Sequence, residues 1–119
     1  MTVDQALAAA LLAYPALAGV AVRAEVAQTG DVAPYIVHTQ FAGVRVNSLA
    51  GDSGLANPRF QIDVYAPTKA QSTTLKAAIR RAVLAEPLLG AVFLNEGSGF
   101  EPDTKLYRYR QDFSFWFYD

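Results

Sequence analysis

The stretch from Ser48 to Ala66 constrains the fold of this 119-residue chain more than any other segment. Its first part is rich in Gly, Ser and Asn, whereas Arg59 to Ala66 alternates apolar and polar residues with the two-residue period of a β-strand. Pro67 then interrupts the strand, and Thr68 is well placed to begin a helix. The apolar positions of this strand should point into a core: Phe60, Ile62 and Val64.

Two capping patterns predict where the helices begin. A Thr followed three residues later by a Gln occurs at residues 2–5 and 68–71, and such a pair can bond reciprocally at a helix N-terminus. The first helix is expected to end near Ala13, before Pro15, and the second near Glu86. One face of the second helix should be buried: Leu75, Ala78, Ile79, Ala82 and Val83.

Further strands are expected at four segments: 20–26, 35–41, 91–95 and 107–118. Gly43 to Asn57 is expected to be a long connection, in which Val44 and Val46 extend the sheet only briefly. Gly97 to Asp103 is expected to be the loop between the last two strands. The order α-β-β-β-α-β-β predicts an α+β fold: a single domain with a largely antiparallel sheet and two helices packed on one face.

The composition limits the class of protein. Hydrophobic residues make up 52% of the chain and charged residues 18%, which is too apolar for a disordered chain. The net charge of −1 provides no general attraction to nucleic acid or to anionic membranes, so neither is expected as a partner. With so few charges, part of the apolar surface is expected to lie in subunit interfaces.

The N-terminus and the cysteine content bear on location. The apolar run from Ala6 to Ala13 is too short to span a membrane, and no basic region precedes it. The absence of cysteine excludes disulfides and thiolate zinc sites, and it fits a reducing compartment. We therefore expect a soluble, cytoplasmic and unprocessed chain.

Candidate catalytic residues are few and lack the spacing of known sites. His38 is the only histidine, and no cysteine can join it in a zinc site. A triad could combine His38 with Asp63 and either Ser48 or Ser53, but no nucleophile elbow supports it.

Glycine pairs and paired carboxylates are equally unspecific. The segments 51–54 and 97–99 each hold two glycines but lack the lysine of a phosphate-binding loop. Glu96 and Glu101 lie near the second segment, and nothing places them across a cleft as glycoside hydrolysis requires. We therefore predict a chain that is not an enzyme, with no catalytic, metal-binding or cofactor-binding residue.

Four segments together resemble one family. They are the Ala-Tyr-Pro-Ala-Leu-Ala-Gly stretch at 13–19, the strand start at 34–37, the loop and strand at 48–66, and the aromatic strand at 107–113. The most specific part is the pattern Leu49-x-Gly51-x-Ser53-Gly54, which leads into the strand that ends at Ala66. In these features the chain resembles the tail completion, or tail terminator, proteins of long-tailed bacteriophages, prophages and gene-transfer particles.

The resemblance implies a structural role in a virion tail. Members are small α+β subunits that form a ring, commonly of six copies, on the finished tail tube. The ring stops tube polymerisation and presents a surface to the head. It follows that the expected partners are further copies of this chain, the major tail-tube protein and a head–tail connector protein, with assembly in the host cytoplasm. The resemblance carries over no site residue and no cofactor.

Protein–protein contacts are predicted on two segments. The long connection is one, because loops of that length are often functional. The last strand is the other, because one of its faces combines Arg and Trp, which are enriched at interface hot spots. On that face we expect Arg108, Arg110, Asp112, Ser114, Trp116 and Tyr118, opposite a core-facing set of Tyr107, Tyr109, Phe113, Phe115 and Phe117. The predicted contact residues are Arg45, Asn47, Asp52, Ser53, Arg108, Arg110, Asp112 and Trp116.

Two other functions remain open from the sequence. A head–tail connector or stopper protein would share the small α+β architecture. A small α+β enzyme or ligand-binding domain would instead show a deep polar pocket between the sheet and the helices.

Overall fold

A computed structural model describes residues 1–49 and 51–118, without the side chains of Ser48 and Asp52. Helix α1 spans Val3–Ala13 and is capped as its sequence predicts. The Thr2 hydroxyl accepts a hydrogen bond from the Gln5 amide at 3.1 Å, and the Gln5 side chain accepts one from the Thr2 amide at 2.8 Å. These bonds satisfy N–H groups that have no partner within the helix. A single 3₁₀ turn, η1 (Pro15–Leu17), follows.

Helix α2 spans Lys69–Ala85, close to its predicted bounds. The Thr68 hydroxyl accepts a hydrogen bond from the Gln71 amide at 3.2 Å and so caps the helix. All five residues predicted for its buried face are buried, and Ser72 joins them. The amphipathic pattern of this helix was therefore a reliable guide to its orientation.

One twisted sheet contains all six strands of the described chain, and these are β1 (Ala21–Ala24), β2 (Tyr35–Ser48), β3 (Gly51–Ala66), β4 (Val92–Glu101), β5 (Leu106–Ser114) and β6 (Phe117–Tyr118). The order across the sheet is β1-β2-β3-β5-β4, and β6 pairs with β3 beyond the end of β5. Only β1 and β2 run parallel; the other pairs are antiparallel. This confirms the predicted α+β fold.

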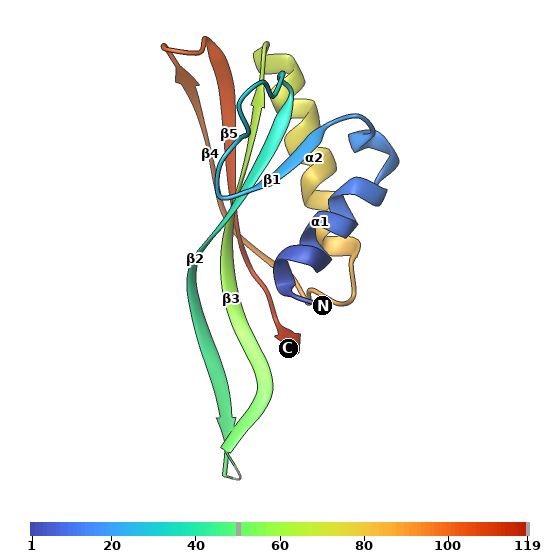
Figure 1. Cartoon of the computed structure of the whole chain (residues 1–119), viewed down its shortest axis with the longest axis vertical. Helices are drawn as coiled ribbons and strands as arrows, with labels where there is room; N and C mark the ends of the chain where they lie inside the picture. Colours follow the sequence, from blue (N-terminus) through green and yellow to red (C-terminus); the bar gives the residue numbers. More distant parts are fainter. Residues whose placement is uncertain (50, 119) are drawn as a thin grey trace.

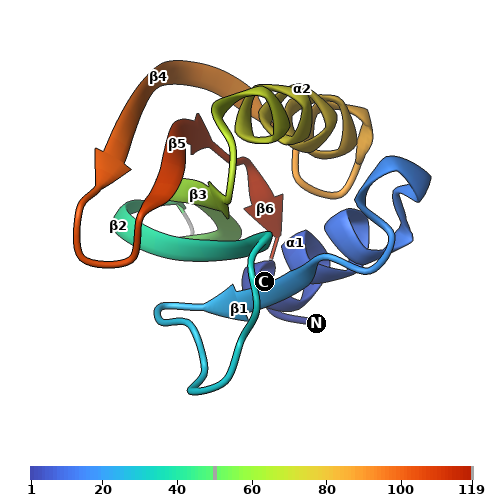
Figure 2. The same cartoon turned by 90° about the horizontal axis from the view of Figure 1, so that it is seen from above.

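Both helices cover the same face of the sheet, as the view from above shows (Figure 2). The core lies between them and the sheet. It includes the predicted strand residues Phe60, Ile62 and Val64, all fully buried. Further members come from both helices and from the C-terminal aromatic run: Leu7, Leu11, Leu75, Ile79, Val83, Phe113 and Phe115.

The predicted connection from Gly43 to Asn57 is wrong, because this segment is a long β-hairpin. Strand β2 continues to Ser48, β3 begins at Gly51, and the two pair along their whole length. Gly51 and Gly54 have φ values of +116° and +80°, which suit glycine at a sharp turn and an irregular strand start. The hairpin projects well beyond the helices (Figure 1), and the molecule measures 52 × 27 × 25 Å.

The predicted loop from Gly97 to Asp103 is also largely strand. Strand β4 continues to Glu101, and Gly97 and Gly99 pair with Arg110 and Arg108 of β5. Pairing uses backbone groups that glycine also has, so the neighbouring strand outweighs the weak strand preference of these residues. The predicted strand at 20–26 is shorter than expected, and the one at 107–118 is interrupted between Ser114 and Phe117.

Candidate assembly surfaces

The hairpin arm (residues 43–57) carries four of the predicted contact residues. Arg45 and Asn47 lie exposed on β2, whereas the side chain of Asp52 lies outside the described residues. The Ser53 hydroxyl is used within the arm, since it donates to the Val46 carbonyl and accepts from the Leu55 amide at 3.2 Å. The arm is thus held by its own hydrogen bonds rather than by a core.

Apolar side chains are exposed on the arm and just before it. Val44 lies on β2, and Leu49, between the two strands, is fully exposed. Phe41 is half-exposed at a register shift between Gln40 and Ala42, where β2 has one more residue than β3. The chain itself leaves these side chains in water, so their burial requires another molecule.

The base of the arm is fixed to the C-terminal segment. The buried Asn57 side chain donates from Nδ2 to the Ser114 hydroxyl and to the Phe115 carbonyl, both at 2.7 Å. The Phe115 amide donates to the Pro58 carbonyl at 2.8 Å. Ser114 is therefore buried, contrary to the prediction that it lies on an exposed face. These bonds set the direction in which the arm leaves the body.

The face of the sheet opposite the helices holds three further predicted residues. Arg108 donates from Nε to Asp63 Oδ1 at 3.1 Å, and Gln61 donates from Nε2 to Asp63 Oδ2 at 2.9 Å. Arg110 and Asp112 form a looser ion pair at 3.8 Å. The structure thus brings Arg108, Arg110 and Asp112 together, but as partners of charges within the chain.

A shallow hollow lies beside this network, where Tyr35 and Tyr65 stack with ring centroids 5.0 Å apart. Burial raises the pKa of both tyrosines, and the nearby charge of Glu101 adds to the effect. Glu25 completes the polar lining of this hollow. The two rings and two carboxylates give this end of the face a negative character.

Trp116 does not share a face with Arg108, which corrects the predicted alternation. The strand breaks after Ser114, and the Trp116 amide donates instead to the Leu89 carbonyl at 2.8 Å. Its side chain lines a cleft of about 380 Å³ between the two chain ends and the connection after α2. We call this the terminal cleft, and its lining residues are Met1, Pro87, Leu88, Trp116, Phe117 and Tyr118.

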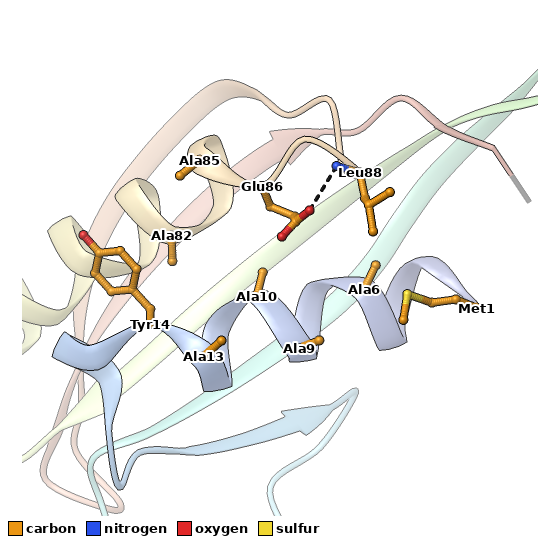
Figure 3. A pocket seen from close by; sticks show the side chains of 10 residues that line it. All are labelled: Met1, Ala6, Ala9, Ala10, Ala13, Tyr14, Ala82, Ala85, Glu86 and Leu88. Carbon is orange, nitrogen blue, oxygen red and sulfur yellow. Dashed lines mark hydrogen bonds between the residues drawn. The ribbon is translucent and has the colours of Figure 1, made fainter.

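An alanine-lined groove of about 390 Å³ separates the two helices and shares Met1 and Leu88 with the terminal cleft. Figure 3 shows alanine side chains from α1 and α2 lining it, with Tyr14 at one end. The Leu88 amide donates to Glu86 Oε1 at 3.1 Å and so shapes the connection after α2. Sequence reasoning missed this groove, because alanines on a helix give no sign of whether a neighbouring helix will cover them.

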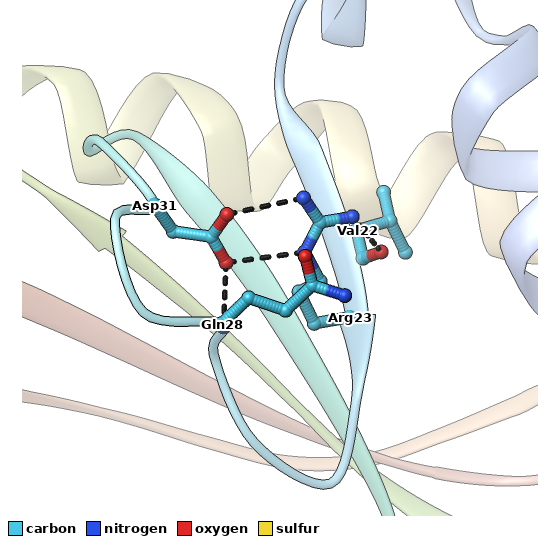
Figure 4. Close-up of polar contacts among 4 residues, drawn as sticks. All are labelled: Val22, Arg23, Gln28 and Asp31. Carbon is cyan, nitrogen blue, oxygen red and sulfur yellow. Dashed lines mark hydrogen bonds and ion pairs between the residues drawn. The ribbon is translucent and has the colours of Figure 1, made fainter.

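The connection between β1 and β2 is closed by an ion pair (Figure 4). Arg23 donates from Nε and Nη2 to the two carboxylate oxygens of Asp31, at 3.1 and 3.0 Å. The Gln28 amide donates to Asp31 Oδ2 at 2.7 Å. The bonds from Arg23 and then from Gln28 lower the pKa of Asp31. This arrangement holds the loop in place and leaves little of Asp31 available to a partner.

The residues of the hypothetical triad are kept apart. His38 is buried beneath α1, with Nδ1 3.1 Å from Asp4 Oδ1. Burial lowers the pKa of His38, although the charge of Asp4 opposes this. His38 pairs with Ile62 of the core face, so the neighbouring Asp63 points to the other side of the sheet. Ser53 lies out on the arm, and the side chain of Ser48 lies outside the described residues.

The described residues lack two further features. They contain no group of three or more His, Cys, Asp or Glu residues placed to hold a metal ion. No helix among them is long and apolar enough to cross a membrane. Glu96 forms an ion pair with Lys76 at 3.1 Å, so its charge is balanced within the chain.

The comparison with protein families decides the identity. Residues 5–118 match the family described as tail completion protein gp17. The chain belongs to this family. It is therefore a structural protein of the phage tail, as the resemblance in its sequence predicted.

The fold agrees with this assignment. A solved chain from the virion of a native gene transfer agent particle superposes with a TM-score of 0.75 at 20% sequence identity. The match covers 98% of this chain and 95% of that one. At this level of identity the likeness establishes the shared fold. No curated protein matches the chain at a significant level.

Proposed function

We propose that this tail completion protein is a tail terminator: a ring of copies, most simply six, that caps the finished tail tube. The ring stops tube polymerisation and presents a surface to a head–tail connector protein. In this proposal residues 1–119 act as one domain, and the partners are further copies, the major tail-tube protein and the connector. The protein assembles in the host cytoplasm and remains in the virion tail. It acts by surface complementarity, without catalysis.

The hairpin arm is the observation that carries this proposal. It extends beyond the helices, and the last pairs of β2 and β3 lie beyond Leu55 and Ala56, where β6 pairs with β3. A projection of this kind adds nothing to the core of its own subunit. It does give a small subunit the reach to contact a neighbour in a ring or the tube below it. Its exposed apolar residues, Val44 and Leu49, suit such a contact.

The hydrogen-bonded network around Asp63, on the face of the sheet opposite the helices, also favours the arm as the main contact surface. Asp63 is 5% exposed and bonded to both Arg108 and Gln61, so this part of the face is already neutralised. Breaking such bonds to bind a partner would cost more than covering exposed apolar groups. We therefore place the main contacts on the arm and on the Trp116 side, and only the rim of an interface on the arginine face.

Negative-stain microscopy tests the proposal directly. The purified chain is mixed with tubes assembled from the major tail-tube protein of the same particle. We expect ring-shaped density at tube ends and none along the tube walls. Bound protein along the walls, or no binding to tubes while the chain joins head connectors, would refute termination and favour a connector role.

A further inference from the structure

A closed ring of identical subunits requires two different surfaces on each copy, because every subunit contacts one neighbour on either side. This requirement rests on the proposed ring. One surface must be complementary to the other without being complementary to itself, or the copies would stop as dimers. A projection on one side of the subunit and a recess of matching surface on the other meet this requirement.

Leu49 is the projection. It lies at the end of the hairpin arm and is fully exposed, so no part of its own chain covers it. The six residues from Val46 to Gly51 contain no charged side chain, and Asp52 follows them, opposite Asn47 in the hairpin. The far end of the arm thus carries an exposed leucine next to uncharged residues, on a paired β-ribbon that extends away from the helices (Figure 1).

The terminal cleft is the recess. Its walls are mainly apolar, and three of its large side chains remain in water: Leu88 at 59%, Trp116 at 45% and Tyr118 at 73% exposure. Trp and Tyr are the residue types most often found at the centre of interfaces. The side chains that line the cleft are uncharged, as are the side chains from Val46 to Gly51 around Leu49.

The cleft is also formed in advance of any contact. The Trp116 amide is bonded to the Leu89 carbonyl at 2.8 Å, which fixes the backbone beneath the indole. Gly90 has a φ of +50°, and a Cβ atom there would lie 3.1 Å from the Trp116 carbonyl oxygen and 3.2 Å from its Cβ. Only glycine allows this approach without displacement. A recess that needs no rearrangement loses less free energy on binding.

We propose that the hairpin arm of one copy packs Leu49 into the terminal cleft of the next copy. The contact is head-to-tail and closes a ring when repeated. It covers the exposed Leu49 of one copy and the exposed Trp116 side chain of the next together. A single such contact is small, so isolated copies associate weakly and the ring becomes stable only when the last contact closes it.

Disulfide trapping provides the first test, because the chain contains no cysteine. The double variant Leu49→Cys/Leu88→Cys should give a ladder of cross-linked species under mild oxidation, ending in a closed ring. The matched control is Leu49→Cys/Leu12→Cys. Leu12 on α1 is 62% exposed, close to the 59% of Leu88, and does not line the cleft. A disulfide needs Cα atoms within about 7 Å. Because Leu88 and Leu12 are similarly exposed, random collisions should cross-link both pairs equally, and only a lasting contact should favour the pair with Leu88.

The only tryptophan of the chain provides the second test. Its emission should shift to shorter wavelength as the concentration of the wild-type chain rises, because Leu49 of a neighbour excludes water from the indole. Leu49→Asp should abolish the shift and the assembly together. Val26→Asp, a matched change at another exposed apolar residue, should leave both unchanged.

The outcomes separate this inference from the proposed function. A specific ladder and a lost shift in Leu49→Asp support the contact. Equal ladders for both cysteine pairs, no ladder, or a shift that Leu49→Asp retains would overturn it. If the shift occurs only when tail-tube protein is added and Leu49→Asp retains it, the cleft binds the tube instead. If the contact fails in one of these ways but micrographs still show capped tubes, the terminator role stands. Uncapped tubes would refute the terminator role, whatever the result for the contact.

Discussion

Arg108 and Asp63 form an ion pair of 3.1 Å across the two central strands β3 and β5, on the face that the helices leave open. The register places Asp63 opposite Arg110, yet its carboxylate bonds to Arg108, two residues away along β5, and to Gln61 of its own strand. The sequence predicts that the face with Arg108 contacts a partner. In the structure, part of this face is instead a network of hydrogen bonds and ion pairs within the subunit.

The first prediction concerns this network. Asp63→Ala should lower the free energy of unfolding by about 1–3 kcal/mol, because it leaves a partly buried guanidinium without its carboxylate. Urea denaturation measures this. Gln61→Ala removes only a neutral donor and should cost less than half as much. Equal, small losses for both variants would show that the ion pair contributes little.

A second prediction concerns the base of the arm. Asn57→Ala should destabilise the fold by about 1–3 kcal/mol, because the buried Ser114 hydroxyl and Phe115 carbonyl lose their donor. Asn47→Ala, on the exposed part of the arm, should change stability by less than about 0.5 kcal/mol. Thermal unfolding of the two variants makes the comparison. If Asn57→Ala is also neutral, the arm is not anchored through this side chain.

The third prediction concerns His38. Because burial lowers its pKa from the ordinary value of 6.5, the unfolded chain binds this proton first as the pH falls. The contribution of His38 to stability is therefore fully present above about pH 7, and it is lost as the pH falls below the unfolded pKa of 6.5 towards the lower pKa of the folded state.

Variants of His38 and of its neighbour Asp4 should change the pH dependence of stability in opposite directions. His38→Gln should flatten the loss of stability between about pH 7 and pH 5, measured as the urea midpoint at each pH. Asp4→Asn should steepen it, because the charge of Asp4 raises the pKa of His38 in the folded chain. Parallel curves for all three proteins would contradict the assignment.

The sequence was a good guide wherever local pattern and burial agree. The reciprocal bonds of Thr2 and Gln5 form as predicted, and the alternation of Phe60, Ile62 and Val64 correctly indicated the core face. These features depend on neighbours within a few residues, which the sequence specifies directly.

The sequence failed where pairing with a distant strand decides the structure. Gly51, Gly54 and Asn57 are typical of loops, yet the first two allow an irregular strand start and the third anchors the arm through its side chain. Trp116 was placed on the wrong side, because the alternation along β5 is lost when Trp116 bonds to Leu89. This break depends on Leu89, in the segment after α2. The alternation of residues within the last strand therefore cannot predict it.

The fourth prediction separates the arm from the fold. Replacing residues 46–55 by Asn-Gly joins Arg45 to its partner Ala56 through a two-residue turn that suits a hairpin. Stability should change by less than about 1 kcal/mol, because the variant keeps Asn57, Phe117 and the core. Circular dichroism during thermal unfolding measures this. A large loss would show that the arm supports the fold of its own subunit.

The length distribution of tail tubes tests the terminator role most directly. Tubes are assembled from tail-tube protein and its length-determining partners, with either the wild-type chain or the shortened-arm variant, and measured by electron microscopy. The account predicts tubes of one length with the wild-type chain, and a broad distribution of overlong, uncapped tubes with the variant. Tubes of one uniform length with the folded, shortened-arm variant, or overlong tubes with the wild-type chain, would contradict it.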